Sequence, residues 1–146
     1  MVFNKSWLAV ILLAAACRPA PKAPDVLKEA VPMEWKGQFC SKEEGDARVV
    51  TTQAQWEEVW KAIGQPAPAA DLRDHFAVAI FLGLKNTGGY GVAFLDPAID
   101  DRAGTLTVKY KVTNPKGMAM QALTKPYAVK VFPKTNLAVH LALQAN

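Results

Sequence analysis

The side chains best able to do chemistry in this 146-residue chain are two cysteines and two histidines. A lone thiol such as Cys40 becomes a nucleophile when a base such as His75 or His140 lies beside it. Residues 38–42 read QFCSK, however, and lack the small residues and turn signals that usually surround a nucleophile. We therefore interpret Cys40 as a small, partly buried thiol at the end of a strand.

Other site chemistries find little support in the sequence. The acidic loop cluster of Asp96, Asp100 and Asp101 lacks the twelve-residue spacing and closing glutamate of a calcium loop. Two cysteines are too few for a thiolate zinc site, and His140 lies in an apolar, strand-like segment. No serine elbow, phosphate-binding glycine loop or carboxylate pair is present. We expect no catalytic residue, no metal and no enzyme activity.

The first sixteen residues, Met1–Ala16, have the layout of a secretory signal peptide. Lys5 supplies the short positive region, the apolar run Trp7–Ala16 follows, and the segment ends in small residues. A run of this length is too short to span a hydrocarbon core of about 30 Å as a helix. We expect this segment to be removed on export.

The position of Cys17 suggests a second step. Leu13-Ala14-Ala15-Ala16-Cys17 resembles the lipobox of bacterial lipoproteins, although the strictest form of that pattern places leucine where Ala14 stands. The resemblance implies that the Cys17 thiol receives a diacylglycerol, that cleavage precedes it, and that fatty acids such as palmitate anchor the protein. The alternative is ordinary cleavage after Ala16, which would release a soluble periplasmic protein.

The sequence thus divides into a signal peptide (1–16), a lipidation site with a linker (17–33) and a folded domain (34–146). Arg18–Pro32 contains four prolines and several alanines without apolar periodicity, which is typical of a semi-extended spacer. Such a spacer holds a domain away from a membrane. We expect the protein in the cell envelope, at its periplasmic or outer surface, with no cofactor beyond the covalent lipid on Cys17.

The charge distribution does not favour nucleic-acid binding. The formal net charge is +4, and removal of the segment that contains Lys5 leaves 16 basic and 13 acidic residues, or +3. The basic residues are scattered along strand-like segments, whereas a nucleic-acid binder gathers them on one face with aromatic residues between them. We interpret them as solvated surface charges.

A single helix is predicted after residue 51. Thr52 and Gln55 form a capping box, and Gly64 supplies the usual stop. One apolar stripe with helical spacing lies between them, which predicts a helix docked on a sheet. Its members are Trp56, Val59, Trp60 and Ile63.

Apolar patterning predicts about seven strands. Ala77–Leu84 is continuously apolar, which indicates a central strand covered on both faces, and Thr105–Thr113 alternates as a half-buried strand does. The turn at 85–89 predicts an antiparallel hairpin between Ala77–Leu84 and Tyr90–Leu95. The fold class is α+β: a mostly antiparallel sheet or sandwich with one helix packed on it. The remaining expected strands are Glu34–Phe39, Asp46–Thr51, Tyr127–Phe132 and Leu137–Leu143.

The segment from Phe81 to Phe132 resembles the C-terminal domain of the PrcB family of protease-complex subunits. The resemblance implies a lipoprotein that associates with a secreted or surface protease and supports its stability. It extends over roughly Ala47 to Lys134. The matching residues are Phe81-Leu82-Gly83, Thr87-Gly88-Gly89-Tyr90-Gly91-Val92, Gln121, Thr124, Pro126 and Tyr127.

A fainter analogy is to the chagasin-type inhibitors of cysteine peptidases. Asn86–Tyr90 and Lys125-Pro126-Tyr127 are similar in chemistry to two of the loops that those inhibitors present. The spacing between the two segments is shorter here, and the middle glycine-rich loop is matched only by Pro115–Met118.

Two segments are candidates for binding a protein partner: Thr87-Gly88-Gly89-Tyr90 and Pro126-Tyr127. Glycines expose backbone groups, and a tyrosine at the rim buries a large area at low entropic cost. If the two segments are neighbours, Tyr90 and Tyr127 flank one groove. The alternative is that the glycines close a hairpin and both tyrosines belong to the core.

These observations predict a membrane-anchored, non-catalytic lipoprotein that binds a protein partner. The first prediction for that partner is a protease, which the protein accompanies as an accessory subunit. A peptidase inhibitor and an envelope structural protein without a protease partner are the alternatives. The sequence leaves the oligomeric state open.

Overall fold

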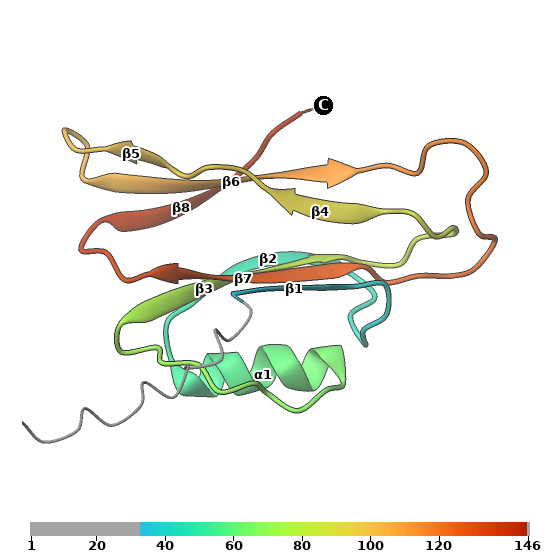
Figure 1. The fold of residues 1–146 in the computed structure, drawn as a ribbon, viewed down its shortest axis with the longest axis horizontal. Coiled ribbons are helices and arrows are strands. Elements are labelled where there is room, and N and C mark those ends of the chain that lie inside the picture. The colour runs from blue at the N-terminus through green and yellow to red at the C-terminus, as the bar shows by residue number, and fades with distance from the viewer. Residues whose placement is uncertain (1–32, 146) are drawn as a thin grey trace, which may run out of the picture.

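The computed structural model describes residues 33–145. The predicted signal peptide, Cys17 and the linker up to residue 32 lie outside this part of the chain. The described residues form one helix and eight strands, arranged as two sheets with the helix on the outside of one of them (Figure 1). The predicted α+β class, with a sandwich of strands and one docked helix, is confirmed.

Helix α1 (Gln53–Ile63) begins and ends where its local signals predict. The Thr52 side chain accepts a hydrogen bond from the Gln55 amide, and the Gln55 side chain accepts one from the Thr52 amide. Gly64 closes the helix with φ +81°, a left-handed conformation that glycine adopts without steric cost. The four residues of the predicted apolar stripe are the buried residues of the helix.

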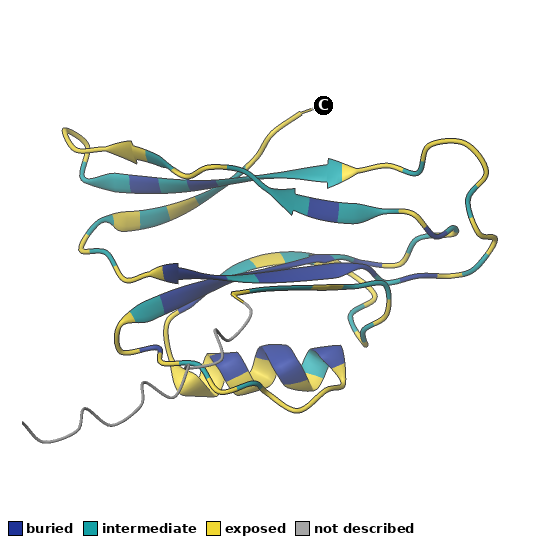
Figure 2. Cartoon of the chain, viewed as in Figure 1, coloured by how far each residue is buried: buried dark blue, intermediate teal, exposed yellow. Residues whose placement is uncertain are grey.

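The helix packs on a four-stranded antiparallel sheet, here called the inner sheet. Its order is β1 (Glu34–Gly37), β7 (Tyr127–Pro133), β3 (His75–Leu82) and β2 (Gly45–Val50). β3 and β7 are therefore its central strands, and both are buried along most of their length (Figure 2). This explains the continuous apolar run of β3, since the helix covers one face of the inner sheet and the second sheet covers the other.

The second sheet, here called the outer sheet, is built around β6 (Thr105–Thr113). β4 (Gly91–Phe94) and β5 (Ala98–Asp100) pair antiparallel with successive parts of β6, and β8 (Ala138–Leu143) pairs with β6 in parallel. The predicted alternation of β6 is confirmed, because Leu106 and Val108 are buried against the inner sheet.

Two hydrophobic clusters separate the three layers. The first lies between helix and inner sheet, where Trp35, Trp56 and Trp60 meet edge to face with ring centroids 5.4–5.7 Å apart. The second lies between the sheets and contains Phe76 and Phe132, whose rings stack at 5.4 Å. Alternate residues of β3 face the two clusters, so this strand joins both cores.

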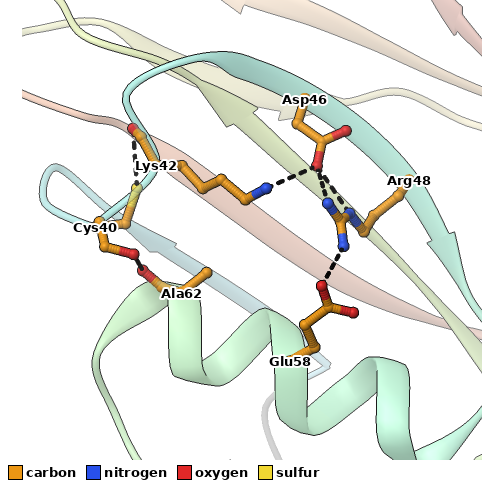
Figure 3. Close-up of polar contacts among 7 residues, drawn as sticks. Cys40, Lys42, Asp46, Arg48, Glu58 and Ala62 are labelled. Carbon is orange, nitrogen blue, oxygen red and sulfur yellow. Dashed lines mark hydrogen bonds and ion pairs between the residues drawn. The ribbon is translucent and has the colours of Figure 1, made fainter.

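Arg48 of β2 adds a polar link between the inner sheet and the helix (Figure 3). Its guanidinium pairs with Asp46 and, at 3.5 Å, with Glu58 of α1. Burial opposes ionisation of Asp46, but Arg48 and Lys42 together outweigh it and hold the pKa of this carboxyl below its usual value. The pair therefore favours the folded state at neutral pH, by a small amount that is lost as pH falls through the lowered pKa.

Three features of the topology differ from the prediction. The predicted hairpin of β3 and β4 is wrong, because β4 pairs with β6 and the segment 83–90 crosses from the inner sheet to the outer one. Gly83, with φ +70°, begins this crossing where a Cβ would lie 2.8 Å from the Glu43 carbonyl oxygen. β5 was expected to be loop, and β8 pairs in parallel within a sheet expected to be mostly antiparallel.

Candidate functional site

Three loops meet at one end of the sandwich, on the right in Figure 1. They are the β1–β2 loop (38–44), the β3–β4 loop (83–90) and the β6–β7 loop (114–126), and we call this surface the loop end. The sequence does not place them together, since they are up to 88 positions apart. Strand directions bring them together: β1, β3 and β6 all end here.

Backbone hydrogen bonds hold the β3–β4 loop to the β6–β7 loop. Lys85 and Thr124 exchange two of them, at 2.8 and 2.9 Å, and the Gly88 amide donates to the Met120 carbonyl at 2.9 Å. The Thr124 hydroxyl, fully buried, donates to the Thr87 carbonyl at 2.9 Å. The two segments on which the family resemblance rests are thus in direct contact.

The β1–β2 loop is tied to the same assembly. The Gln38 side-chain amide donates to the Tyr90 carbonyl at 2.8 Å, and the Lys125 amide donates to the Gln38 carbonyl at 2.8 Å. The Lys125 ammonium pairs with Glu43 at 3.2 Å. Because the loops bond to one another, the loop end is preorganised, which lowers the entropic cost of binding a partner.

The predicted binding residues fall into an outer and an inner group. Tyr90 is half-buried at the loop end, with the Lys85 ammonium 5.5 Å from its ring centroid. Pro126 is buried, and Tyr127 retains 6% exposure within the cluster beneath the helix. The two tyrosines therefore do not flank an open groove, and Tyr127 is a core residue, as the alternative interpretation expects.

Tyr127 has a packing role that involves Gly37 of β1. A Cβ on Gly37 would lie 2.5 Å from Cε1 of the Tyr127 ring, so a residue without a side chain lets this ring lie across the edge strand. Burial, and secondarily the charge of Cys40, raises the pKa of the Tyr127 hydroxyl above its ordinary value. The hydroxyl is therefore neutral at physiological pH.

Cys40 lies in the loop after β1 and is half-buried, as predicted. Its thiol is 3.2 Å from the Lys125 carbonyl oxygen and 3.9 Å from that of Lys42 (Figure 3 draws the second contact). Burial raises the pKa of this thiol, against the smaller opposing effects of Lys42 and Lys125. His75 contacts the Asp71 carbonyl and His140 is exposed on β8, whereas the Cys40 thiol contacts the carbonyls of Lys42 and Lys125.

Slow alkylation of Cys40 is a direct test of this environment. Because the thiolate is the reactive form and burial disfavours it, we expect iodoacetamide at pH 7.5 to modify Cys40 about tenfold more slowly than a model cysteine peptide. The measurement uses a Cys17→Ser chain, in which Cys40 is the remaining thiol. The same chain in guanidinium should react at the model rate, and equal rates in the folded and unfolded states would contradict the assignment.

The loop end exposes apolar side chains that were not predicted from the sequence. Met118 is fully exposed, and Met120 and Leu123 are 65% and 63% exposed, in a loop where polar residues are the rule. Phe39 and Leu84 add exposed apolar area from the other two loops. The signal was present in the composition of residues 114–126, but without the fold nothing showed that these side chains lie outside the core.

The loop end exposes apolar side chains for contact and does not bring reactive side chains together. No group of three histidine, cysteine or acidic side chains that suits a metal ion occurs within residues 33–145. No helix in that range is long and apolar enough to cross a membrane. The loop end is thus a preorganised surface that exposes apolar side chains to solvent.

Comparison with protein families agrees with the resemblance seen in the sequence. Residues 76–133 match the family model described as PrcB C-terminal, so this segment, from β3 to β7, is PrcB C-terminal-like. It includes the β3–β4 and β6–β7 loops and covers less than half of the chain. Comparison with curated proteins and with solved structures gives no match.

Proposed function

We propose that this protein is a non-catalytic binding module of the cell envelope that accompanies a protease as an accessory subunit. The loop end is the observation that supports this most directly: three mutually bonded loops present large apolar side chains to solvent. The PrcB C-terminal match supports the class of partner, because the resemblance to that family implies association with a protease.

The exposed side chains of the β6–β7 loop suit a protein partner. Methionine is unbranched and polarizable, so Met118 and Met120 adapt to the shape of an apolar partner surface. The backbone beneath them is fixed by the Gly88–Met120 and Lys85–Thr124 bonds. A rigid base with adaptable side chains favours specific binding without a large ordering cost.

The inhibitor alternative has less support than the accessory subunit. A chagasin-like inhibitor would present Lys125-Pro126-Tyr127 to the peptidase, yet Pro126 and Tyr127 are buried. An envelope structural protein without a protease partner remains the third class, which the experiment below separates from the first.

Attachment to the envelope is the second half of the proposal. It rests on the signal-like segment Met1–Ala16, the lipobox-like sequence before Cys17 and the proline-rich spacer that follows. Two or three acyl chains give stable attachment, whereas one chain binds only marginally.

A co-purification experiment tests the loop end as the protease-binding surface. The tagged full chain is isolated from detergent-extracted envelope, and protease activity in the eluate is measured with a generic casein substrate. Met120→Ser with Leu123→Ser should lower the recovered activity about tenfold or more, because losing two central apolar contacts costs over 1 kcal/mol each.

Ile99→Ser is the matched control, since Ile99 is 63% exposed on β5, which lies toward the opposite end of the sandwich (Figure 1). It should recover as much activity as the parent chain. Recovery of equal activity by the Met120/Leu123 double variant would contradict the assignment of the loop end. Inhibition of the recovered protease by added purified chain would favour the inhibitor class instead.

A further inference from the structure

Strand β8 forms one border of the outer sheet and has an unpaired side. The Ala138 amide donates to the Gly104 carbonyl at 3.0 Å, and the Gln144 amide donates to the Tyr110 carbonyl at 2.8 Å. Peptide groups alternate along a strand, so those of Val139, Leu141 and Leu143 point away from β6. No described strand pairs with that side of β8.

The other sheet edges carry the features that block strand addition, and β8 does not. β1 contains Glu34 and Lys36, and β2 contains Asp46 and Arg48. The edge formed by β4 and β5 consists of two short strands of four and three residues, interrupted by Pro97. β8 reads AVHLAL, with no charged residue or proline, and an edge of that kind is a template for another strand.

A cavity of about 300 Å³ opens between β2 and β8, beside this edge. Apolar side chains from both sheets line it, among them Val49, Phe76, Leu137 and Val139. Its volume is at the lower end of the roughly 300–1,000 Å³ range of ligand pockets, which suits a side chain better than a large free ligand. An added strand would direct alternate side chains toward this space.

Two lysines lie at the two ends of β8. Lys134 lines the cavity just before the strand begins, and Lys109 lies beside Leu143 and Gln144 at its far end. Neither ammonium forms an ion pair with an acidic side chain in the described part of the chain. Positive charge at both ends favours a segment with acidic flanks over a second copy, which would bring the same lysines together.

We propose that the free edge of β8 binds an extended segment of a partner protein as an added strand. The segment has apolar residues at alternate positions, one of which enters the cavity between β2 and β8, and carboxylates near both ends. The interaction surface is separate from the loop end, so this inference goes beyond the proposed function and does not depend on it.

Fluorescence anisotropy with labelled peptides tests the edge. The probes have about eight residues, aspartate at each end, alternating threonine and valine, and valine, leucine or phenylalanine in the middle. Leu143→Pro removes one outward amide, since Leu143 is 60% exposed and its amide, next to that of Gln144 which bonds to Tyr110, points away from β6. We expect it to weaken binding about tenfold, while Leu143→Ala, which keeps the amide, changes binding less than about threefold.

A second measurement leaves the protein unchanged. Probes N-methylated at the amides of one edge should lose binding, and probes methylated at the other edge should keep it, because an added strand bonds through one edge. The proposal is overturned by no binding of any probe at about 1 mM, by equal binding of both methylated probes, or by equal affinity of Leu143→Pro. A dimer that Leu143→Pro abolishes would assign the edge to a second copy and also overturn it. The Met120→Ser, Leu123→Ser variant should bind the probes normally, which separates this test from that of the loop end.

Discussion

Trp56→Ala should lower the free energy of unfolding by about 4 kcal/mol, the largest loss we expect from one substitution in the folded domain. Trp56 has no exposed surface, and its indole N–H donates to the Pro68 carbonyl at 2.9 Å. Removing the ring leaves a cavity beneath the helix, deprives Trp35 and Trp60 of an edge-to-face contact, and leaves the Pro68 carbonyl without this bond.

Urea denaturation followed by far-ultraviolet circular dichroism measures this loss. The free energies of unfolding of the parent chain and the variant are compared with the same dependence on urea concentration (the m value) for both. Gln53→Ala is the control, because Gln53 is exposed in the first turn of the same helix, and it should change stability by less than about 0.5 kcal/mol. A loss below about 1.5 kcal/mol in Trp56→Ala would mean that the helix is not anchored by this ring.

Cys17→Ser should shift the protein from the membrane fraction to the soluble fraction or leave it as an unprocessed precursor. Cys17 lies outside the described residues, and the expectation rests on the lipobox-like sequence alone. A serine hydroxyl does not replace the thiol that accepts the lipid, and without acyl chains no stable attachment remains. Membrane fractionation, with intact mass measured on the purified protein, reports both attachment and processing.

Cys40→Ser is the matched control for that experiment, since it removes the other thiol of the chain and leaves Cys17 in place. It should fractionate with the membrane as the parent does. Equal attachment, with intact masses that differ only by the replacement of one sulfur by one oxygen, would remove the lipid anchor from the proposal, while the loop end would be unaffected.

Local signals predicted the helix and most of the strands correctly. The capping box at Thr52 and Gln55, the apolar stripe and Gly64 are all interactions within a dozen residues, so the sequence contains the whole pattern. The alternation of Thr105–Thr113 likewise depends on one strand and one buried face. These elements needed no knowledge of their partners.

The pairing of the strands needed information that lies far away in the sequence. A glycine-rich turn after β3 is compatible with a hairpin, but Gly83 packs against the backbone of Glu43 and Gly45, and the chain then crosses to the other sheet. β5 is too short to show a pattern. β8 pairs in parallel with β6 because the chain runs back through β7 of the inner sheet between these two strands and so enters β8 in the same direction as β6.

The candidate site was predicted in part. The two segments chosen from the family resemblance do meet, through Thr124 and Thr87, but the aromatic residue of the second segment is inside the core. Buried and exposed aromatic side chains look the same in a sequence when both follow a turn. The exposed methionines were not predicted because apolar residues are expected in the core. Loops also expose apolar side chains, but which ones they expose can be told only once the fold is known.

The position of β1 has a mechanical consequence if the proposed lipid tether is loaded. A pull that arrives along the chain from the N-terminal side acts on Glu34 first, and β1 is an edge strand with a four-residue antiparallel register to β7. Because β1 ends at the loop end, a load between the proposed tether before Glu34 and a partner at the loop end would run along β1 and act on its hydrogen bonds to β7 together, in shear. Displacement of β1 would take Trp35 out of the tryptophan cluster and remove its ring contacts with Trp56 and Trp60 of the helix.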